Sequence, residues 1–372
     1  MTPKSSRRGQ PRIRRLALVA TGLLGLSVLA ASSTTQASVS SKGGLTAYVT
    51  NAEDEGKAPG MGTVIPINLT SNKPETPIKV GRRAGTNDLV VTSDGKTGYV
   101  TNEGTNTVVP ITLATGKLGK AIPVGAKPVA ISFVPHTNER WAWVANYGGK
   151  TVSTVNVVTG RLGQTISVPE VGPNTVAFTP DGRTCYVANW GTEDAAGSTV
   201  TPIRVTHGGA SGRVLPSIDV GLHPNWVAVT PDGGTAYVAN KGSNSITPID
   251  VRSNTAGKAI RVPGPAIEME ISPDGRTAYV AIAGSSPEID EVIPVDLTTT
   301  PVTVGSAIKL KPKSQPHWIT FTPDGQTAYV VGNGNSTVTP ITVATGKPGR
   351  PIQVTADPDS DLLAISIIQT QN

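Results

Sequence analysis

The 372-residue sequence contains very few cysteine, phenylalanine and histidine residues. It has one cysteine, Cys185, so no internal disulfide can form. Phenylalanine occurs three times and histidine four times, so clusters of either aromatic residues or histidines stand out. No helical periodicity follows residue 30, and the sequence has no GxSxG elbow, Walker loop, HExxH or CxxCH motif. These absences exclude disulfide scaffolds, P-loop enzymes, c-type haem proteins and the familiar serine and zinc hydrolases.

The first 37 residues have the three parts of an export signal. An apolar run fills residues 16–30, and the small residues of TQA at 35–37 suit a cleavage site. The basic region before the apolar run contains Lys4, Arg7, Arg8, Arg12, Arg14 and Arg15. We expect a signal peptide at 1–37, a short linker at 38–44, and a secreted or surface-held domain at 45–372. An uncleaved membrane anchor is the alternative.

Removing this segment changes how the charge is interpreted. The whole chain has 32 basic and 26 acidic residues, but six basic residues belong to the signal, which leaves 26 of each. The basic isoelectric point is therefore a property of the export segment, and nucleic acid is not expected as a partner. No membrane span is expected after signal cleavage, and we expect a monomer.

A five-residue pattern repeats along the rest of the chain. It reads AYVAN at 236–240 and occurs in seven copies, at intervals of about 40–50 residues that are typical of propeller blades. The aromatic position is occupied by Tyr48, Tyr99, Trp143, Tyr186, Tyr237, Tyr279 and Tyr329. Cys185 stands in a slot that otherwise holds Ala or Gly, which predicts a buried, inert thiol.

The unit at 224–262 contains four short strands separated by turns, of which PDGG is the tightest. We therefore predict an all-β fold, a seven-bladed β-propeller with four antiparallel strands per blade. The first blade lacks an innermost strand and residues 361–368 form a strand without a blade, so the C-terminal strand should join the N-terminal blade and close the ring. Prolines that recur in the third strand should mark bulges or positions where the hydrogen-bond ladder between strands needs no amide hydrogen. They are Pro66, Pro110, Pro202, Pro248, Pro294 and Pro340, with Thr154 in the third blade.

The repeated YV(T/A)N motif resembles the YVTN family of β-propeller repeat proteins over residues 45–372. The motif is complete in five copies, counting Trp143 as a replacement for Tyr, whereas Ile282 and Gly332 replace Asn in the last two. The resemblance implies an extracytoplasmic propeller. It does not identify a function, because one fold supports many functions.

Candidate site residues gather where the chain enters the innermost strands, beside the turns between strands two and three. Alignment on the PDG turns places Asp88, Thr175, Trp226, Glu268 and Trp318 at one position, and Asn87, Asn174, Asn225, Ile267 and His317 at its neighbour. The predicted ligand-binding set is Trp226, Glu268, Trp318, His223, His317, Asn225, Asp88, Tyr147 and Trp190.

Two kinds of function fit these residues. The sequence favours a binding or scaffold module whose central face holds a small ligand, a polysaccharide or a protein, although the tryptophans could instead only fill the channel mouth. The alternative is a hydrolase or lyase that uses the central His and Glu residues. Propeller lactonases and streptogramin lyases have similar blades, but their local motifs do not match here. No catalytic residue, metal or cofactor is predicted, and the recurring aspartates of the PDG turns are expected to serve turn geometry and not calcium.

Overall fold

The computed structural model describes residues 44–52, 61–82, 84–284, 289–356 and 360–369. All of them belong to the unit Ser32–Asn372. The predicted signal segment and residues 38–43 of the linker lie outside the described residues, so both stay predictions. In the described part of the chain, no helix has the length and apolar character needed to cross a membrane.

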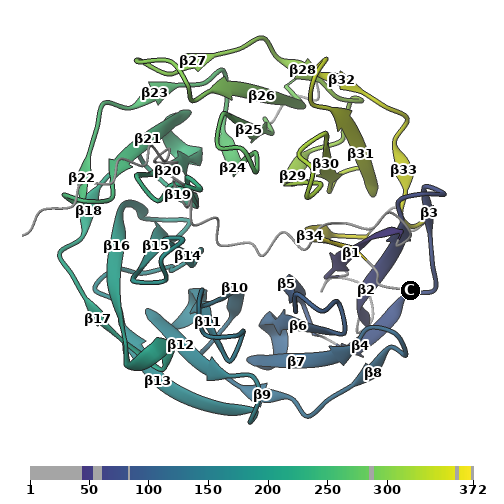
Figure 1. Cartoon of the computed structure of the whole chain (residues 1–372), viewed down its shortest axis with the longest axis vertical. Coiled ribbons are helices and arrows are strands. Elements are labelled where there is room, and N and C mark those ends of the chain that lie inside the picture. The colour runs from purple at the N-terminus through teal and green to yellow at the C-terminus, as the bar shows by residue number, and fades with distance from the viewer. Residues whose placement is uncertain (1–43, 53–60, 83, 285–288, 357–359, 370–372) are drawn as a thin grey trace, which may run out of the picture. The chain divides into compact units, whose positions relative to one another are not determined.

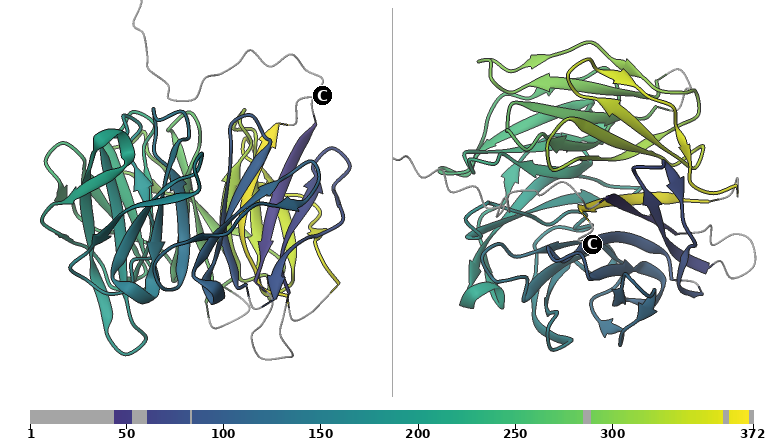
Figure 2. Two further views of the ribbon diagram at one scale, coloured as in Figure 1. Left: turned by 90° about the horizontal axis from the view of Figure 1, so that it is seen from below. Right: turned by 45° about the vertical axis from the view of Figure 1, so that its right-hand side comes forward.

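Seven separate antiparallel sheets surround a central axis, which confirms the predicted seven-bladed propeller (Figure 1). Seen from the side, the strands run between the two faces of the ring (Figure 2). We number the blades along the chain: blade 1 (residues 45–82 with 362–369), blade 2 (86–123), blade 3 (128–167), blade 4 (177–219), blade 5 (224–261), blade 6 (266–309) and blade 7 (316–353).

Each blade contributes one strand to the central axis and two behind it. The innermost strands of blades 1 to 7 are β34 (Leu362–Gln369), β5 (Thr86–Val91), β10 (Pro128–Phe133), β14 (Ala177–Phe178), β19 (Pro224–Val229), β24 (Ala266–Ile271) and β29 (Pro316–Phe321). The second strands are β1 (Leu45–Asn51), β6 (Thr97–Asn102), β11 (Trp141–Asn146), β15 (Thr184–Gly191), β20 (Thr235–Asn240), β25 (Thr277–Ile282) and β30 (Thr327–Gly332). The third strands are β2 (Met61–Asn68), β7 (Thr107–Thr112), β12 (Thr151–Asn156), β16 (Ala196–Thr206), β21 (Ser245–Asp250), β26 (Glu291–Asp296) and β31 (Thr337–Thr342).

The outer strand is divided into two pieces in every blade except blade 3. The first pieces are β3 (Lys73–Pro74), β8 (Lys117–Leu118), β17 (Ser211–Val214), β22 (Thr255–Ala256), β27 (Thr303–Val304) and β32 (Lys347–Pro348). The second pieces are β4 (Ile78–Arg82), β9 (Ile122–Pro123), β18 (Ile218–Asp219), β23 (Ile260–Arg261), β28 (Ile308–Lys309) and β33 (Ile352–Gln353), whereas β13 (Arg161–Ser167) is continuous. Short 3₁₀ turns are η1 (Glu103–Thr105), η2 (Tyr147–Gly149), η3 (His207–Gly209) and η4 (Lys241–Ser243).

The third-strand prolines coincide with the division of the outer strand. Pro248 has no amide hydrogen for the ladder, and its carbonyl accepts a bond from the Gly257 amide at 2.7 Å between β22 and β23. In blade 3 Thr154 takes the place of proline, and its hydroxyl accepts the Gln164 amide at 2.7 Å within the uninterrupted β13. The prediction that these prolines are a structural device is confirmed.

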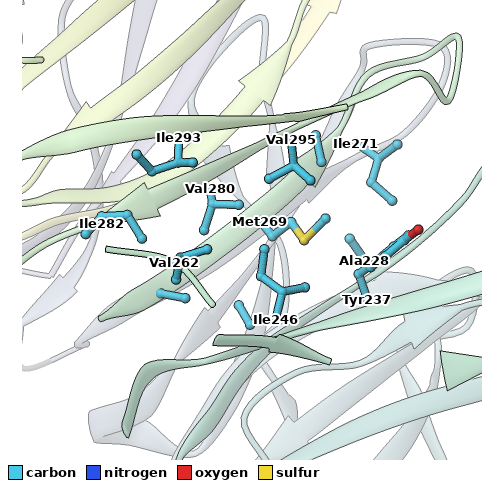
Figure 3. Packing of buried hydrophobic residues seen from close by; sticks show 13 residues of the cluster. Ala228, Tyr237, Ile246, Val262, Met269, Ile271, Val280, Ile282, Ile293 and Val295 are labelled. Carbon is cyan, nitrogen blue, oxygen red and sulfur yellow. The ribbon is translucent and has the colours of Figure 1, made fainter. Parts of the chain in front are cut away.

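The AYVAN pattern buries both faces of the second strand. Tyr237 and Ala239 belong to an apolar cluster shared with blade 6, while Ala236 and Val238 belong to one shared with blade 4. Figure 3 shows the blade 5–blade 6 cluster, where residues of the two sheets interdigitate. In the described part of the chain each neighbouring pair of blades shares one such cluster. Cys185 lies fully buried in the blade 3–blade 4 cluster, and burial raises the pKa of its thiol, as predicted for an inert residue.

The C-terminal strand closes the ring. Strand β34 pairs antiparallel with β1, with Tyr48 opposite Ser366 and Val49 opposite Ile365. The Thr50 hydroxyl accepts the Ala364 amide at 2.9 Å. The predicted closure is confirmed, although the paired strand runs one residue further, to Gln369.

The PDG turns follow ordinary turn chemistry. In blade 5 the Asp232 carboxylate accepts bonds from the Thr230 hydroxyl at 2.5 Å and from the Gly234 amide at 2.9 Å. These bonds, the Thr230 hydroxyl first, lower the pKa of Asp232. The aspartates are therefore used within their own turns, as the sequence predicts.

Deleting residues 360–372 should destabilise the mature protein strongly. The deletion removes the innermost strand of blade 1 and exposes the apolar faces that pack on Leu362, Ala364 and Ile365. Burial of three such side chains contributes at least about 4 kcal/mol. Thermal unfolding followed by circular dichroism measures the effect. A truncated protein that melts at the wild-type temperature would contradict the closure.

Candidate functional site

The innermost strands carry a β-bulge that positions the predicted site residues. In blade 5 the register shifts between Pro224 and Trp226, in blade 6 between Ala266 and Glu268, and in blade 7 between Pro316 and Trp318. A bulge turns a side chain away from the regular alternation of a strand. Trp226, Glu268 and Trp318 thus occupy equivalent places, as the sequence alignment predicts.

The two tryptophans meet in front of blade 6. Trp226 comes from blade 5 and Trp318 from blade 7, yet their ring centroids are 4.5 Å apart with the planes at 69°. Both rings are partly exposed. Because β24 packs between β19 and β29, the ring contact spans the width of blade 6. This edge-to-face pair forms an apolar surface that links blades 5 and 7.

Glu268 is buried to 1% exposure, and its Oε2 accepts the amide of Ile319 in blade 7 at 3.1 Å. Its Oε1 has no hydrogen-bond partner among the residues that the structure describes. Burial, and then the charge of Glu270, raise the pKa of Glu268 well above its usual range, and burial raises the pKa of Glu270 to about 8. The ion pairs among the described residues lie elsewhere, between Lys96 and Asp94, Lys127 and Glu103, and Arg183 and Asp181.

Asp88 holds the corresponding position in blade 2. Its carboxylate accepts the amide of Ile131 in blade 3 at 2.8 Å and its neighbour's amide, that of Leu89, at 2.7 Å. Burial raises the pKa of Asp88 to about 7 against the opposing effect of these two bonds. Asn225 likewise donates from Nδ2 to the carbonyl of Ile267 in blade 6 at 2.5 Å. Asp88, Asn225 and Glu268 therefore tie successive blades together at the axis.

His317 lies where the ring closes, between blade 7 and the C-terminal strand. Its Nδ1 is 3.2 Å from the carbonyl of Leu363, which can only accept, so Nδ1 carries the proton and Nε2 presents a lone pair. Among the described residues Nε2 has no bonded partner, and the side chain is partly exposed. Burial lowers the pKa of His317, Asp361 opposes this effect and Lys241 reinforces it. The lowered pKa favours the neutral form of the imidazole.

His223 belongs to a different group, an aromatic row across blades 3 to 5. Its Nδ1 bonds to the carbonyl of Trp190 at 3.1 Å, and the two rings lie 4.3 Å apart. Tyr147 lies on the other side, 6.0 Å from the Trp190 ring. We call Tyr147, Trp190 and His223 the aromatic row. Within the described residues no group of three or more His, Cys, Asp or Glu side chains is placed to hold a metal ion.

Two residues near the axis were missing from the predicted site. Lys241 is exposed in η4, and Asp361 precedes β34. Neither position carries a motif that sequence inspection could use. Glu270 lies beside Glu268, because residues two apart share one face of a strand.

A separate groove of about 740 Å³ opens between the outer parts of blades 6 and 7. Its lining includes Tyr279, Asp296, Lys309 and Lys347. None of the predicted site residues reaches it, and it contains no histidine.

The fold and the axial residues define the protein as a seven-bladed β-propeller with titratable groups at its centre. No protein-family model matches the chain and no curated protein is similar to it, so the YVTN resemblance rests on the repeats themselves. Many solved structures do share the fold.

Several of these solved structures are named enzymes or putative enzymes. A putative 6-phosphogluconolactonase of Bacteroides fragilis is 16% identical, with 89% of this chain and 99% of that chain covered and a TM-score of 0.69. The periplasmic gluconolactonase of Pseudomonas aeruginosa is 16% identical, with 88% and 100% covered and a TM-score of 0.68. The hydrazine synthase of Kuenenia stuttgartiensis is 20% identical, with 76% and 86% covered and a TM-score of 0.61. At these identities the likeness concerns the fold alone.

The substitution Glu268→Gln should flatten the pH dependence of stability. Glu268 and Glu270 bind protons more tightly in the folded chain than in the unfolded one, so wild-type stability should fall as pH rises from 4.5 towards about 8. Glutamine keeps an oxygen for the Ile319 amide and removes the charge. Urea unfolding should show equal stability near pH 4.5 and a variant at least about 1.4 kcal/mol more stable at pH 9. Stability that changes with pH in parallel for the two proteins would contradict a raised pKa of Glu268.

Proposed function

We propose that this chain is an exported β-propeller that hydrolyses a small lactone at the mouth of its central axis. The observation that carries the proposal is the imidazole of His317, whose Nδ1–H is fixed by the Leu363 carbonyl and whose Nε2 has no bonded partner among the described residues, in a side chain that is partly exposed. A base of this kind is what the hydrolysis of an ester needs at neutral pH.

The neighbouring charges suit the steps of this reaction. Nε2 of His317 takes a proton from a water molecule, whose oxygen attacks the lactone carbonyl. The negative charge of the tetrahedral intermediate would be offset by Lys241, while Asp361 stabilises the imidazolium. The ring C–O bond then breaks, and the imidazolium returns its proton to the departing alkoxide to give a hydroxy acid. Trp226 and Trp318 supply an apolar wall against the carbon ring.

The remaining support comes from the sequence and from similar folds. Two of the structural neighbours are described as a periplasmic gluconolactonase and a putative 6-phosphogluconolactonase, which makes a lactone the first substrate to test. The basic and apolar parts of residues 1–37 support export, with cleavage near Ser38 and a propeller domain at 45–372.

A binding module without catalysis is the second candidate. The aromatic row favours it, because Tyr147 and His223 are partly exposed on the same face and flank Trp190. Such a row offers flat apolar faces to a sugar or a peptide side chain.

The substitution His317→Gln should abolish lactone hydrolysis. Measured in a pH-stat with glucono-1,5-lactone, kcat should fall by about 10²–10⁴-fold because the base is lost. The wild-type rate should rise with pH through a midpoint below 6.5, since the pKa of His317 is lowered. His207→Gln, at an exposed outer turn, is the matched control. Activity that survives His317→Gln rules out this mechanism, and lactone binding without turnover in the wild type favours the binding module.

A further inference from the structure

Blade 6 presents two carboxyl groups at the axis without a basic partner. Glu268 and Glu270 are two residues apart on β24 and therefore share one face of the strand. The ion pairs among the described residues do not involve either side chain, and Lys and Arg are absent from β19, β25 and β29, which pack against β24. A buried acidic pair that lacks a cation of its own is costly to maintain.

The oxygen atoms of this pair are incompletely used. Oε2 of Glu268 accepts the Ile319 amide, whereas its buried Oε1 has no hydrogen-bond partner in the described part of the chain. Glu270 is partly exposed, as are Ser132, Thr320 and Ser366 at the equivalent positions of other blades, so solvent reaches the axis at this level. The side chain of Glu270 is thus in part accessible from solvent.

Aromatic rings stand beside the same carboxyl groups. Trp226 and Trp318 occupy the positions equivalent to Glu268 on the two flanking inner strands, and their rings meet in front of it. Indole faces attract organic cations through the ring quadrupole, most strongly where water is excluded. Carboxylates supply the opposite charge, so the two kinds of group together select a positively charged, partly apolar solute.

We propose that the channel at blade 6 binds an organic ammonium ion, held between the carboxyl groups of Glu268 and Glu270 and the rings of Trp226 and Trp318. A metal ion fits less well, because the described residues offer no third acidic, His or Cys ligand and indole does not coordinate metals. This site shares the tryptophan pair with the proposed lactone site, but its carboxyl groups are separate from the base and charges of that site, which lie on His317, Asp361 and Lys241.

Binding should depend on pH through the acidic pair. The other titratable groups on the elements packed against β24 are His317, Tyr237, Tyr279 and Lys241. None of them is among the causes of the raised pKa values of Glu268 and Glu270. An ammonium ion competes with the protons on this pair, so its affinity should increase as pH rises from 6 to 9.

The test titrates the mature protein with choline and follows tryptophan fluorescence, with calorimetry as a second readout. Saturable binding of choline is expected, with at least a tenfold weaker response to its uncharged isostere 3,3-dimethyl-1-butanol. Glu270→Gln should weaken choline binding at least tenfold at pH 8.5, whereas Glu170→Gln, at an exposed site, should leave it unchanged. Circular dichroism confirms that both variants are folded.

Four results would overturn the proposal. Equal binding of choline and the isostere would show an apolar site only. Choline affinity that is unaffected by Glu270→Gln would place the ion elsewhere. Failure of both choline and tetramethylammonium to bind, or calcium binding that is lost in Glu270→Gln, would exclude an organic cation site.

Discussion

Each blade of this propeller buries its two faces only against the blades beside it, and this constraint governs the rest of the structure. The second strand of blade 5 shows it most directly. Tyr237 packs towards blade 6, whereas Ala236 and Val238 pack towards blade 4. A blade at the end of an open row would leave one apolar face in water, at about 25 cal/mol for every Å² exposed. Strand β34 completes blade 1, so the ring has no end blade with an exposed apolar face.

Ring closure also builds the candidate site. The carbonyl that fixes the His317 tautomer belongs to Leu363 on the closing strand, and Asp361 precedes the same strand. Elsewhere around the axis the equivalent polar positions tie blades together, as Asp88 does through the Ile131 amide. Polar groups at the axis therefore serve the fold in most blades, and blades 6 and 7 are where titratable groups keep unused atoms.

Much of the fold could be predicted because its signals are local and repeated. The AYVAN period, the PDG turns and the orphan strands at the two ends determine the number of blades and the closure. The contacts of the site are not local in this way. Nothing near His317 in the sequence indicates Leu363, 46 residues further on, or Lys241, which comes from blade 5. The burial of Glu268 was also hidden, because a short alternating strand does not reveal which residues the next blade covers.

The account depends most on the state of His317, and nitrogen-15 NMR of the histidine side chains measures that state directly. At pH 7 the His317 resonances should show a protonated Nδ1 and an unprotonated Nε2, with titration below pH 6.5. Assignment would follow from the signal that disappears in His317→Gln. An imidazolium at pH 7, or a neutral ring protonated on Nε2, would contradict the claim that ring closure holds a free base at the mouth of the propeller.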